Sequence, residues 1–269
     1  AAFCAALLNA QPMGFWSPHT LVGDARRHGV VVRTPDLNAS AASAILEGDS
    51  EAEVRLGLEY VRGIGTDLAE EISAGRPYAS VEDLRRRMPK LSLPILEALA
   101  TSGAFGCFGI DRRSALWTAG AMAQTSEDRL AGIVTGVDAP TLPGMSPEEL
   151  SHADLWATGV APDGHPTRYI REKLTGLGVI TATGLIDQPA GERVFVGGVV
   201  THRQRPATAG GTTFLNLEDE TGLINVVISK GCWQRYKGVA RGAPALLIRG
   251  RLEKEEGVIN VVADKLEPL

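Results

Sequence analysis

The stretch RVFVGGVVTHRQRPATAGGTTFLNLEDETGLINVVIS, residues 193–229, decides the fold of the C-terminal part of the chain. Segments rich in β-branched residues alternate with turn residues, which is the pattern of short antiparallel strands. Strands are expected in RVFVGGVVTHRQR, in TTFLNLEDETG and in LINVVIS. The paired glycines of the first segment predict a coiled or bulged strand, because glycine inside a strand often marks a bend.

The residues that follow complete this pattern. KGCWQRYKGVARG predicts a short helix or loop, and PALLIRGRLEKEEG and VINVVADKLEPL predict two more strands joined by a tight turn at Gly257. Three strands, a helix and two strands are the order of an OB-fold, a five-stranded Greek-key barrel. We therefore predict an OB-fold over residues 191–269, with Gly198 and Gly250 at the bends of the long strands.

A second pattern, VRGIGTDLAEEI at residues 61–72, places two glycines just before a run with helical spacing. It resembles a helix-hairpin-helix motif, in which backbone N–H groups face a DNA phosphate without reading bases. Gly65 is expected at a turn that needs positive φ, and Thr66 fits an N-cap. The alternative is a glycine turn that only packs two helices. The candidate DNA-binding residues are Arg62, Gly63, Ile64, Gly65 and Thr66.

Helical patterns joined by short turns predict a compact α-helical module over residues 53–123. Ser80 is expected to cap one of its helices and Gly103 to end another. The sequence RRRMPK adds a basic cluster, Arg85, Arg86, Arg87 and Lys90, with no acid inside it. This cluster either lies along a DNA backbone or forms a solvated helix face.

The predicted barrel carries its own candidate residues. OB-folds that bind nucleic acids use the face of strands two and three and the loops between strands 1–2 and 4–5. Phe214 starts the second strand, where its ring either stacks on a base or points into the barrel. For the arginine pairs the alternative is a solubilising surface. The candidates are Arg203, Arg205, Phe214, Asn216, Arg249 and Arg251.

Composition limits the remaining classes of function. The chain has 269 residues and a formal net charge of −5, so nucleic-acid binding must come from local patches. Three widely separated cysteines without CxxC spacing favour reduced cytoplasmic thiols over zinc or a disulfide framework. The sequence contains no run of 18 apolar residues, so it predicts no membrane span. We find no catalytic set and no metal-ligand spacing among the histidines and carboxylates.

Six stretches in order then resemble one family: AALLNAQPMGF, ARRHGVVVRTPDLNAS, VRLGLEYVRGIG, LEALATSGAFGCFGIDRRSALW, DLWATGVAPDGHP and GGVVTHRQRPATAGGTTFLNLEDETGLINVV. They look like the C-terminal part of bacterial family C DNA polymerases, the DnaE-type alpha subunits, over essentially the whole chain. The residues of LLNAQPMGF and THRQRPATAGG resemble the error-prone, damage-inducible ImuC branch more closely than the main replicative subunit.

The resemblance implies an α+β multidomain fold with a role for each part. Residues 1–52 look like the end of the polymerase fingers, and residues 53–123 like a tandem helix-hairpin-helix module that grips duplex DNA. Residues 124–190 look like a linker with connecting helices. Residues 191–269 look like the OB-fold domain that handles the single-stranded template. The alternatives are a stand-alone OB-fold and helical binding module, or the same region of the replicative alpha subunit.

The resemblance also implies what lies outside the chain. The family's catalytic aspartates belong to the palm, so we expect no cofactor here, Mg²⁺ in the complete polymerase, and no activity from this chain alone. QTSEDRL lacks the bulky apolar end of a sliding-clamp peptide, which suits recruitment to the clamp through accessory mutasome proteins. A cytoplasmic role in translesion synthesis follows. The absence of an initiator Met indicates a fragment.

Overall fold

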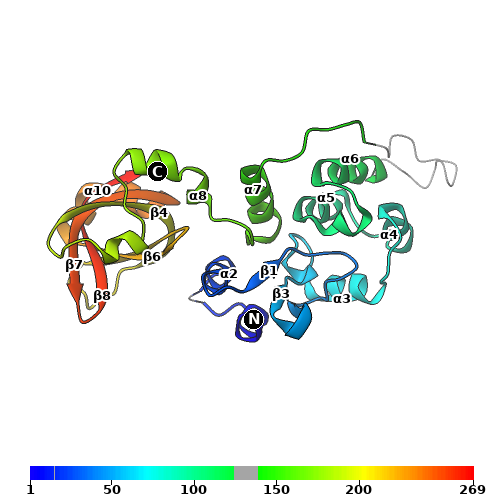
Figure 1. Ribbon diagram of the computed structural model, residues 1–269, viewed down its shortest axis with the longest axis horizontal. Helices are drawn as coiled ribbons and strands as arrows, with labels where there is room; N and C mark the ends of the chain where they lie inside the picture. The colour runs from blue at the N-terminus through cyan, green and yellow to red at the C-terminus, as the bar shows by residue number, and fades with distance from the viewer. Residues whose placement is uncertain (15, 124–138) are drawn as a thin grey trace. The chain divides into compact units, whose positions relative to one another are not determined.

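The structure, a computed structural model, describes residues 1–14, 16–123 and 139–269, which form two compact units (Figure 1). One unit holds residues 1–14 and 25–163, and the other holds residues 15–24 and 164–269. The expectation about QTSEDRL concerns residues outside those described. No helix within the described ranges is long and apolar enough to cross a membrane.

The first unit is mainly helical. Its elements in chain order are α1 (Ala2–Asn9), β1 (Val31–Arg33), β2 (Ile45–Glu47), η1 (Asp49–Glu51), β3 (Glu53–Arg55), η2 (Leu58–Tyr60), α3 (Thr66–Ala74), α4 (Val81–Arg87), α5 (Leu93–Ser102), η3 (Ala104–Phe108), α6 (Arg112–Ala123) and α7 (Pro147–Thr158). The core shared by the elements from η2 to α6 contains Leu58, Leu84, Leu96, Leu99 and Phe105, each at most 1% exposed. Burial of these apolar side chains is the main force that holds the helices together.

The predicted helix ends of this unit are confirmed. The Ser80 hydroxyl accepts a hydrogen bond from the Asp83 N–H at 3.2 Å, so Ser80 caps α4. Gly103 ends α5 with φ 85°, a left-handed conformation that glycine adopts without a Cβ clash.

A small three-stranded sheet lies between α1 and α3 in the sequence. Val54 at the centre of β3 lies opposite Val32 of the parallel β1 and Leu46 of the antiparallel β2. Residues 39–52 have mostly small and acidic side chains and no strand pattern, although β2 lies among them. Since β3 pairs with both other strands, residues on either side of position 52 share one sheet.

A buried ion pair fixes α7 to the rest of this unit. The Arg112 guanidinium lies 2.7 Å from the Asp154 carboxylate, and the two side chains are 14% and 3% exposed. Arg112 also donates to the Leu150 carbonyl at 3.3 Å, while Arg113 pairs with Glu149 at 2.6 Å near the start of α7. Burial raises the pKa of Asp154 to about 6, against the opposing effect of Arg112.

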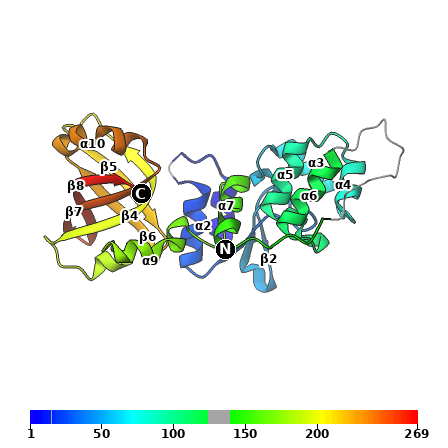
Figure 2. The ribbon, with the colours of Figure 1, turned by 90° about the horizontal axis from the view of Figure 1, so that it is seen from above.

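The second unit is the barrel (Figures 1 and 2). Its elements are α8 (Pro166–Tyr169), α9 (Arg171–Gly176), η4 (Thr183–Ile186), β4 (Arg193–Gln204), β5 (Thr213–Asp219), β6 (Gly222–Ile228), α10 (Lys230–Gly242), β7 (Ala245–Glu255) and β8 (Val258–Pro268). Helix α2 (Pro18–Arg27) begins in this unit and crosses the division at residue 24. The strands close in the order β4-β5-β6-β8-β7, with β6 and β8 parallel, which confirms the predicted OB-fold.

Two predicted glycine positions have different roles in the barrel. At Gly250 the β7–β8 register shifts, and a Cβ there would lie 2.5 Å from the Val262 carbonyl oxygen. At Gly198 a Cβ would lie 2.5 Å from the Glu218 carbonyl oxygen, so the backbones of β4 and β5 approach closely. The bulge of β4 lies further along, between Val200 and His202, and not at the paired glycines.

The raised pKa of Asp154 predicts a pH-dependent stability. The pKa of the folded state, about 6, exceeds the ordinary value of 3.8. The folded state therefore favours the protonated Asp154 carboxyl. This contribution to the unfolding free energy is present at low pH and is lost as the pH rises through about 6. Asp154→Asn removes this titration. Calorimetry of both proteins should show that, from about pH 5 to about pH 7.5, the wild type loses about 1 kcal/mol of unfolding free energy relative to the variant. Parallel pH profiles for the two proteins would contradict the assignment.

Candidate nucleic-acid interfaces

The glycine hairpin joins η2 to α3. Ile64 at its tip is only 5% exposed, and its N–H donates to the Val61 carbonyl at 2.9 Å. Gly63 has φ 82°, whereas Gly65 has φ −86° and ψ 172°. The buried isoleucine and the left-handed glycine together turn the chain from η2 into α3.

Two expectations about this hairpin are wrong. The left-handed conformation belongs to Gly63 and not to Gly65, because the chain reverses before Ile64 and is already extended at Gly65. Thr66 is the first helical residue, so the N-cap position falls to Gly65, which has no side chain to accept a hydrogen bond. Sequence alone placed both features correctly in the hairpin but one or two residues too late.

The start of α3 has the geometry of an anion-binding helix terminus. The first N–H to bond within the helix is that of Ala69, which donates to the Gly65 carbonyl, and no side chain caps the preceding turn. N–H groups in a first turn lack intrahelical acceptors and carry partial positive charge. A Cβ at Gly65 would meet no protein atom within 4 Å, so the backbone is open to approach there. The carboxylate of Asp67 in the same turn opposes an anion.

Helix α7 supports the hairpin from a distant part of the sequence. The Arg62 N–H donates to the Ala157 carbonyl at 2.7 Å, and the Arg62 guanidinium lies 5.0 Å from the centre of the Trp156 ring. The guanidinium is thus held by a cation–π contact beside the hairpin. Sequence analysis missed Trp156 and Ala157, because no local pattern connects residues that far apart.

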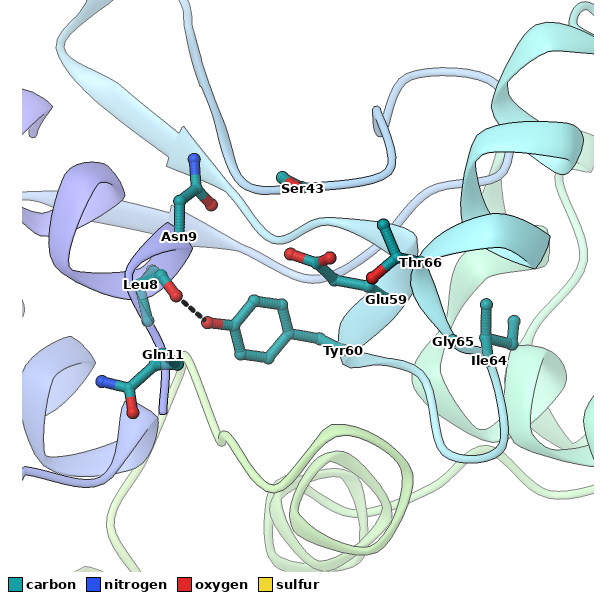
Figure 3. A pocket seen from close by; sticks show the side chains of 9 residues that line it. All are labelled: Leu8, Asn9, Gln11, Ser43, Glu59, Tyr60, Ile64, Gly65 and Thr66. Carbon is teal, nitrogen blue, oxygen red and sulfur yellow. Dashed lines mark hydrogen bonds between the residues drawn. The ribbon is translucent and has the colours of Figure 1, made fainter. Parts of the chain in front are cut away.

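A polar pocket of about 500 Å³ adjoins the hairpin (Figure 3). It is lined by Leu8, Asn9, Gln11, Ser43, Glu59, Tyr60, Ile64, Gly65 and Thr66. The Tyr60 hydroxyl donates to the Leu8 carbonyl at 2.8 Å, and burial raises the pKa of Tyr60 to about 12, so its hydroxyl remains a donor. The Glu59 carboxylate gives this pocket a negative charge, which, like Asp67, opposes a phosphate at the start of α3.

The basic cluster of α4 is bonded within the protein. Arg86 and Arg87 contact the Asp83 carboxylate at 2.6 and 3.4 Å. Lys90 pairs with Glu71, and Arg85 donates to the Pro89 carbonyl. These partners were not visible as acids inside RRRMPK. Exposed ion pairs contribute little free energy, so they do not prevent a competing phosphate contact. A role of these four residues in DNA binding stays a prediction.

On the barrel, Phe214 points outward. It is 39% exposed, while its strand neighbours Thr213 and Leu215 are each 1% exposed. The alternative in which the ring fills the barrel is therefore wrong. Asn216 shares this face, because side chains two apart on a strand point the same way. Its amide donates to the Asn225 side-chain oxygen at 2.8 Å, which continues the face onto β6.

The arginines of the barrel have structural partners. Arg203 donates to the carbonyls of Ala240 and Ala243 at the end of α10, the first of them at 3.0 Å. Arg205 lies over the Trp233 ring at 5.3 Å. Arg249 pairs with Asp264 and Arg251 with Glu253, both at 2.7 Å. Arg203 thus complements the carbonyl end of α10, a role that no local sequence signal indicated. Contact of these arginines with nucleic acid stays a prediction.

Comparison with protein families agrees with both architectures. Residues 29–115 match the helix-hairpin-helix motif family, and residues 194–269 match the OB-fold nucleic acid binding domain family. Together with the closed barrel, these matches define the class: a helix-hairpin-helix module followed by an OB-fold domain.

The chain is also similar to named polymerases. It is 56% identical over 270 residues to the error-prone DNA polymerase of Mycolicibacterium paratuberculosis, covering 99% of this chain and 24% of that protein. It is 55% identical over 281 residues to the error-prone DNA polymerase of Nocardia farcinica, covering 100% of this chain and 24% of that protein. The corresponding values for the Corynebacterium efficiens enzyme are 49%, 100% and 25%. The chain therefore spans about a quarter of the length of these relatives.

The described residues contain no group of three or more His, Cys, Asp or Glu side chains that could hold a metal ion.

The backbone of the hairpin predicts a loss of stability on substitution of Gly63 and none on substitution of Gly65. Gly63→Ala forces a Cβ into the left-handed region and should lower the free energy of unfolding by about 1 kcal/mol. Gly65→Ala is the matched control, because its extended backbone and open surroundings accept a Cβ without loss. Urea denaturation of the two variants measures this difference. Equal losses, or a larger loss at Gly65, would contradict the assigned conformations.

The contacts of Arg203 predict a structural effect. Arg203→Ala should lower the unfolding free energy of the barrel by about 0.5–1 kcal/mol, since α10 loses its cationic partner. Arg251→Ala, which removes an exposed pair with Glu253, should change it by less than about 0.5 kcal/mol. Thermal denaturation followed by circular dichroism compares them. An unchanged melting temperature for Arg203→Ala would refute the capping role.

Proposed function

We propose that this chain is the DNA-binding C-terminal portion of an error-prone DNA polymerase that acts in damage-tolerant, translesion synthesis. The helical unit grips duplex DNA, and the barrel holds the single-stranded template. The support is the similarity to error-prone DNA polymerases over 99% of the chain, together with two domains of nucleic-acid-binding families.

The observation that carries the proposal is the outward face of β5. Phe214 offers an exposed ring, and Asn216 and Asn225 offer amides beside it. Aromatic rings stack on bases of any sequence, and amides hydrogen-bond to base edges. This face suits the bases of a single strand, whereas exposed arginines elsewhere on the barrel suit its phosphates.

The hairpin suits a different ligand. Amides at the start of α3 and the Arg62 guanidinium offer positive charge without base recognition, which is what a duplex backbone requires. The acidic residues near this site and the net charge of −5 limit the number of phosphate contacts. We therefore expect weak, salt-dependent binding of duplex DNA, with a dissociation constant on the order of 10⁻⁴–10⁻⁶ M at physiological salt.

The remaining functions are proposed for the complete polymerase. Nucleotidyl transfer requires Mg²⁺ held by palm carboxylates, which we place outside this chain. Recruitment to the sliding clamp through mutasome proteins of the ImuC branch, and a cytoplasmic location, belong to the same proposal. The residues of LLNAQPMGF and THRQRPATAGG support the assignment to that branch.

Phe214→Ala tests the proposal most simply. Loss of one stacked base should weaken binding of an oligothymidylate by about 1–3 kcal/mol. The salt dependence of the affinity should stay the same, because no phosphate contact is lost. Fluorescence anisotropy at several salt concentrations measures both quantities.

Two controls accompany this variant. The melting temperature of the barrel should be nearly unchanged, since the ring is exposed, and affinity for duplex DNA should be that of the wild type. Wild-type affinity of a folded Phe214→Ala protein for single strands would remove this face from the binding site.

A further inference from the structure

The face of the barrel that bears Phe214 has a second aromatic ring, contributed by a segment far away in sequence. Trp16 is 43% exposed and packs edge-on against His202, with ring centroids 5.3 Å apart and planes at 73°. His202 of β4 lies opposite Asn216 of β5 in the strand register. The Trp16 ring therefore packs against the register partner of Asn216, which is two residues from Phe214.

Hydrogen bonds fix this segment on the barrel unit. The Thr20 N–H donates to the Ser17 hydroxyl at 3.2 Å, which caps the first turn of α2. The Thr20 hydroxyl donates to the Glu218 carboxylate at 3.0 Å. Thr20 and Glu218 are 3% and 1% exposed. Because a buried charge-assisted hydrogen bond is costly to break, the turn that follows Trp16 is firmly positioned.

The same hydrogen bond changes the electrostatics of the face. Alternation along β5 places Phe214, Asn216 and Glu218 on one side of the strand. Glu218 would put a carboxylate on this side, but the first turn of α2 covers it. Asn225 and its register partner Asn260 extend the row with two more amides. From Phe214 to Asn260 the exposed part of the row thus carries a ring and amides, and the Glu253 carboxylate opposite Asn260 is paired with Arg251.

We propose that Trp16 is a second stacking position for the bases of single-stranded nucleic acid, so that residues 16–24 are part of the binding face of the barrel. The inference rests on the proposed single-strand binding and adds a ligand-contacting residue to it. Phe214 holds one base, and Trp16, supported edge-on by His202, holds another along the same strand. Stacking on two rings is tolerant of sequence, as a template-binding surface requires.

The test uses the whole 269-residue chain and an oligothymidylate. Trp16→Ala should weaken binding about tenfold, and Trp16→Phe, which keeps a ring, should stay within about threefold of the wild type. The salt slope should be that of the wild type in both variants, because no phosphate contact is removed. Trp117→Ala is the matched control: it removes a ring that is 47% exposed, on α6 of the helical unit, and should leave this affinity unchanged.

A direct readout accompanies the affinities. Stacking should quench tryptophan fluorescence when the oligothymidylate is added to the wild type, and Trp16→Phe should lose most of this quenching. If the Trp16 variants only fold less well, their melting temperature falls while the quenching per bound oligonucleotide stays that of the wild type. That result would overturn the inference.

The variants separate this inference from the proposed function. If Phe214→Ala weakens binding and Trp16→Ala does not, Trp16 is no stacking position, while single-strand binding by the barrel stands. If neither variant binds more weakly than the wild type, the face is not the binding surface and both statements fail. Equal losses for Trp16→Ala and Trp16→Phe, with wild-type quenching, would also contradict a stacking role.

Discussion

Closure of the barrel depends on two points where neighbouring backbones leave no room for a side chain. At Gly198 and Gly250 any Cβ would come within 2.5 Å of a carbonyl oxygen on the adjacent strand. Glycine permits this approach of β4 to β5 and of β7 to β8, and the β7–β8 register also shifts at Gly250, so that the sheet can return upon itself. The strand register that results decides which side chains of β5 fill the core and which point outward. The outward position of Phe214 and Asn216 is therefore a consequence of closure.

The two units offer nucleic acid different chemistry. The hairpin presents backbone amides and a guanidinium that Trp156 holds in place, and it rests on α7, which the buried Arg112–Asp154 pair fixes. The barrel presents rings and amides on one face, with Glu218 covered by the first turn of α2. A phosphate backbone matches the first surface and unstacked bases match the second. An acidic chain can thus carry two binding surfaces without a large basic patch.

Local patterns in the sequence were enough to predict the order of the barrel strands, the cap at Ser80 and the stop at Gly103. Each depends on the conformational preference of a few neighbouring residues. The strand β2 is only three residues long, too short for an alternating pattern to appear. The partners of Arg62 and Arg203, and the position of Trp16 beside His202, come from distant parts of the chain. Such contacts are set by tertiary packing, which a reading of local patterns does not contain.

We propose above that the outward face of β4, β5 and β6 binds the bases of a single strand. Photo-crosslinking to an oligonucleotide that carries bromodeoxyuridine, followed by mass spectrometry of the modified peptides, tests it most directly. We expect crosslinks in peptides that contain Phe214 and Trp16. Crosslinks confined to the Arg249 and Arg251 strand, with none in those two peptides, would contradict it.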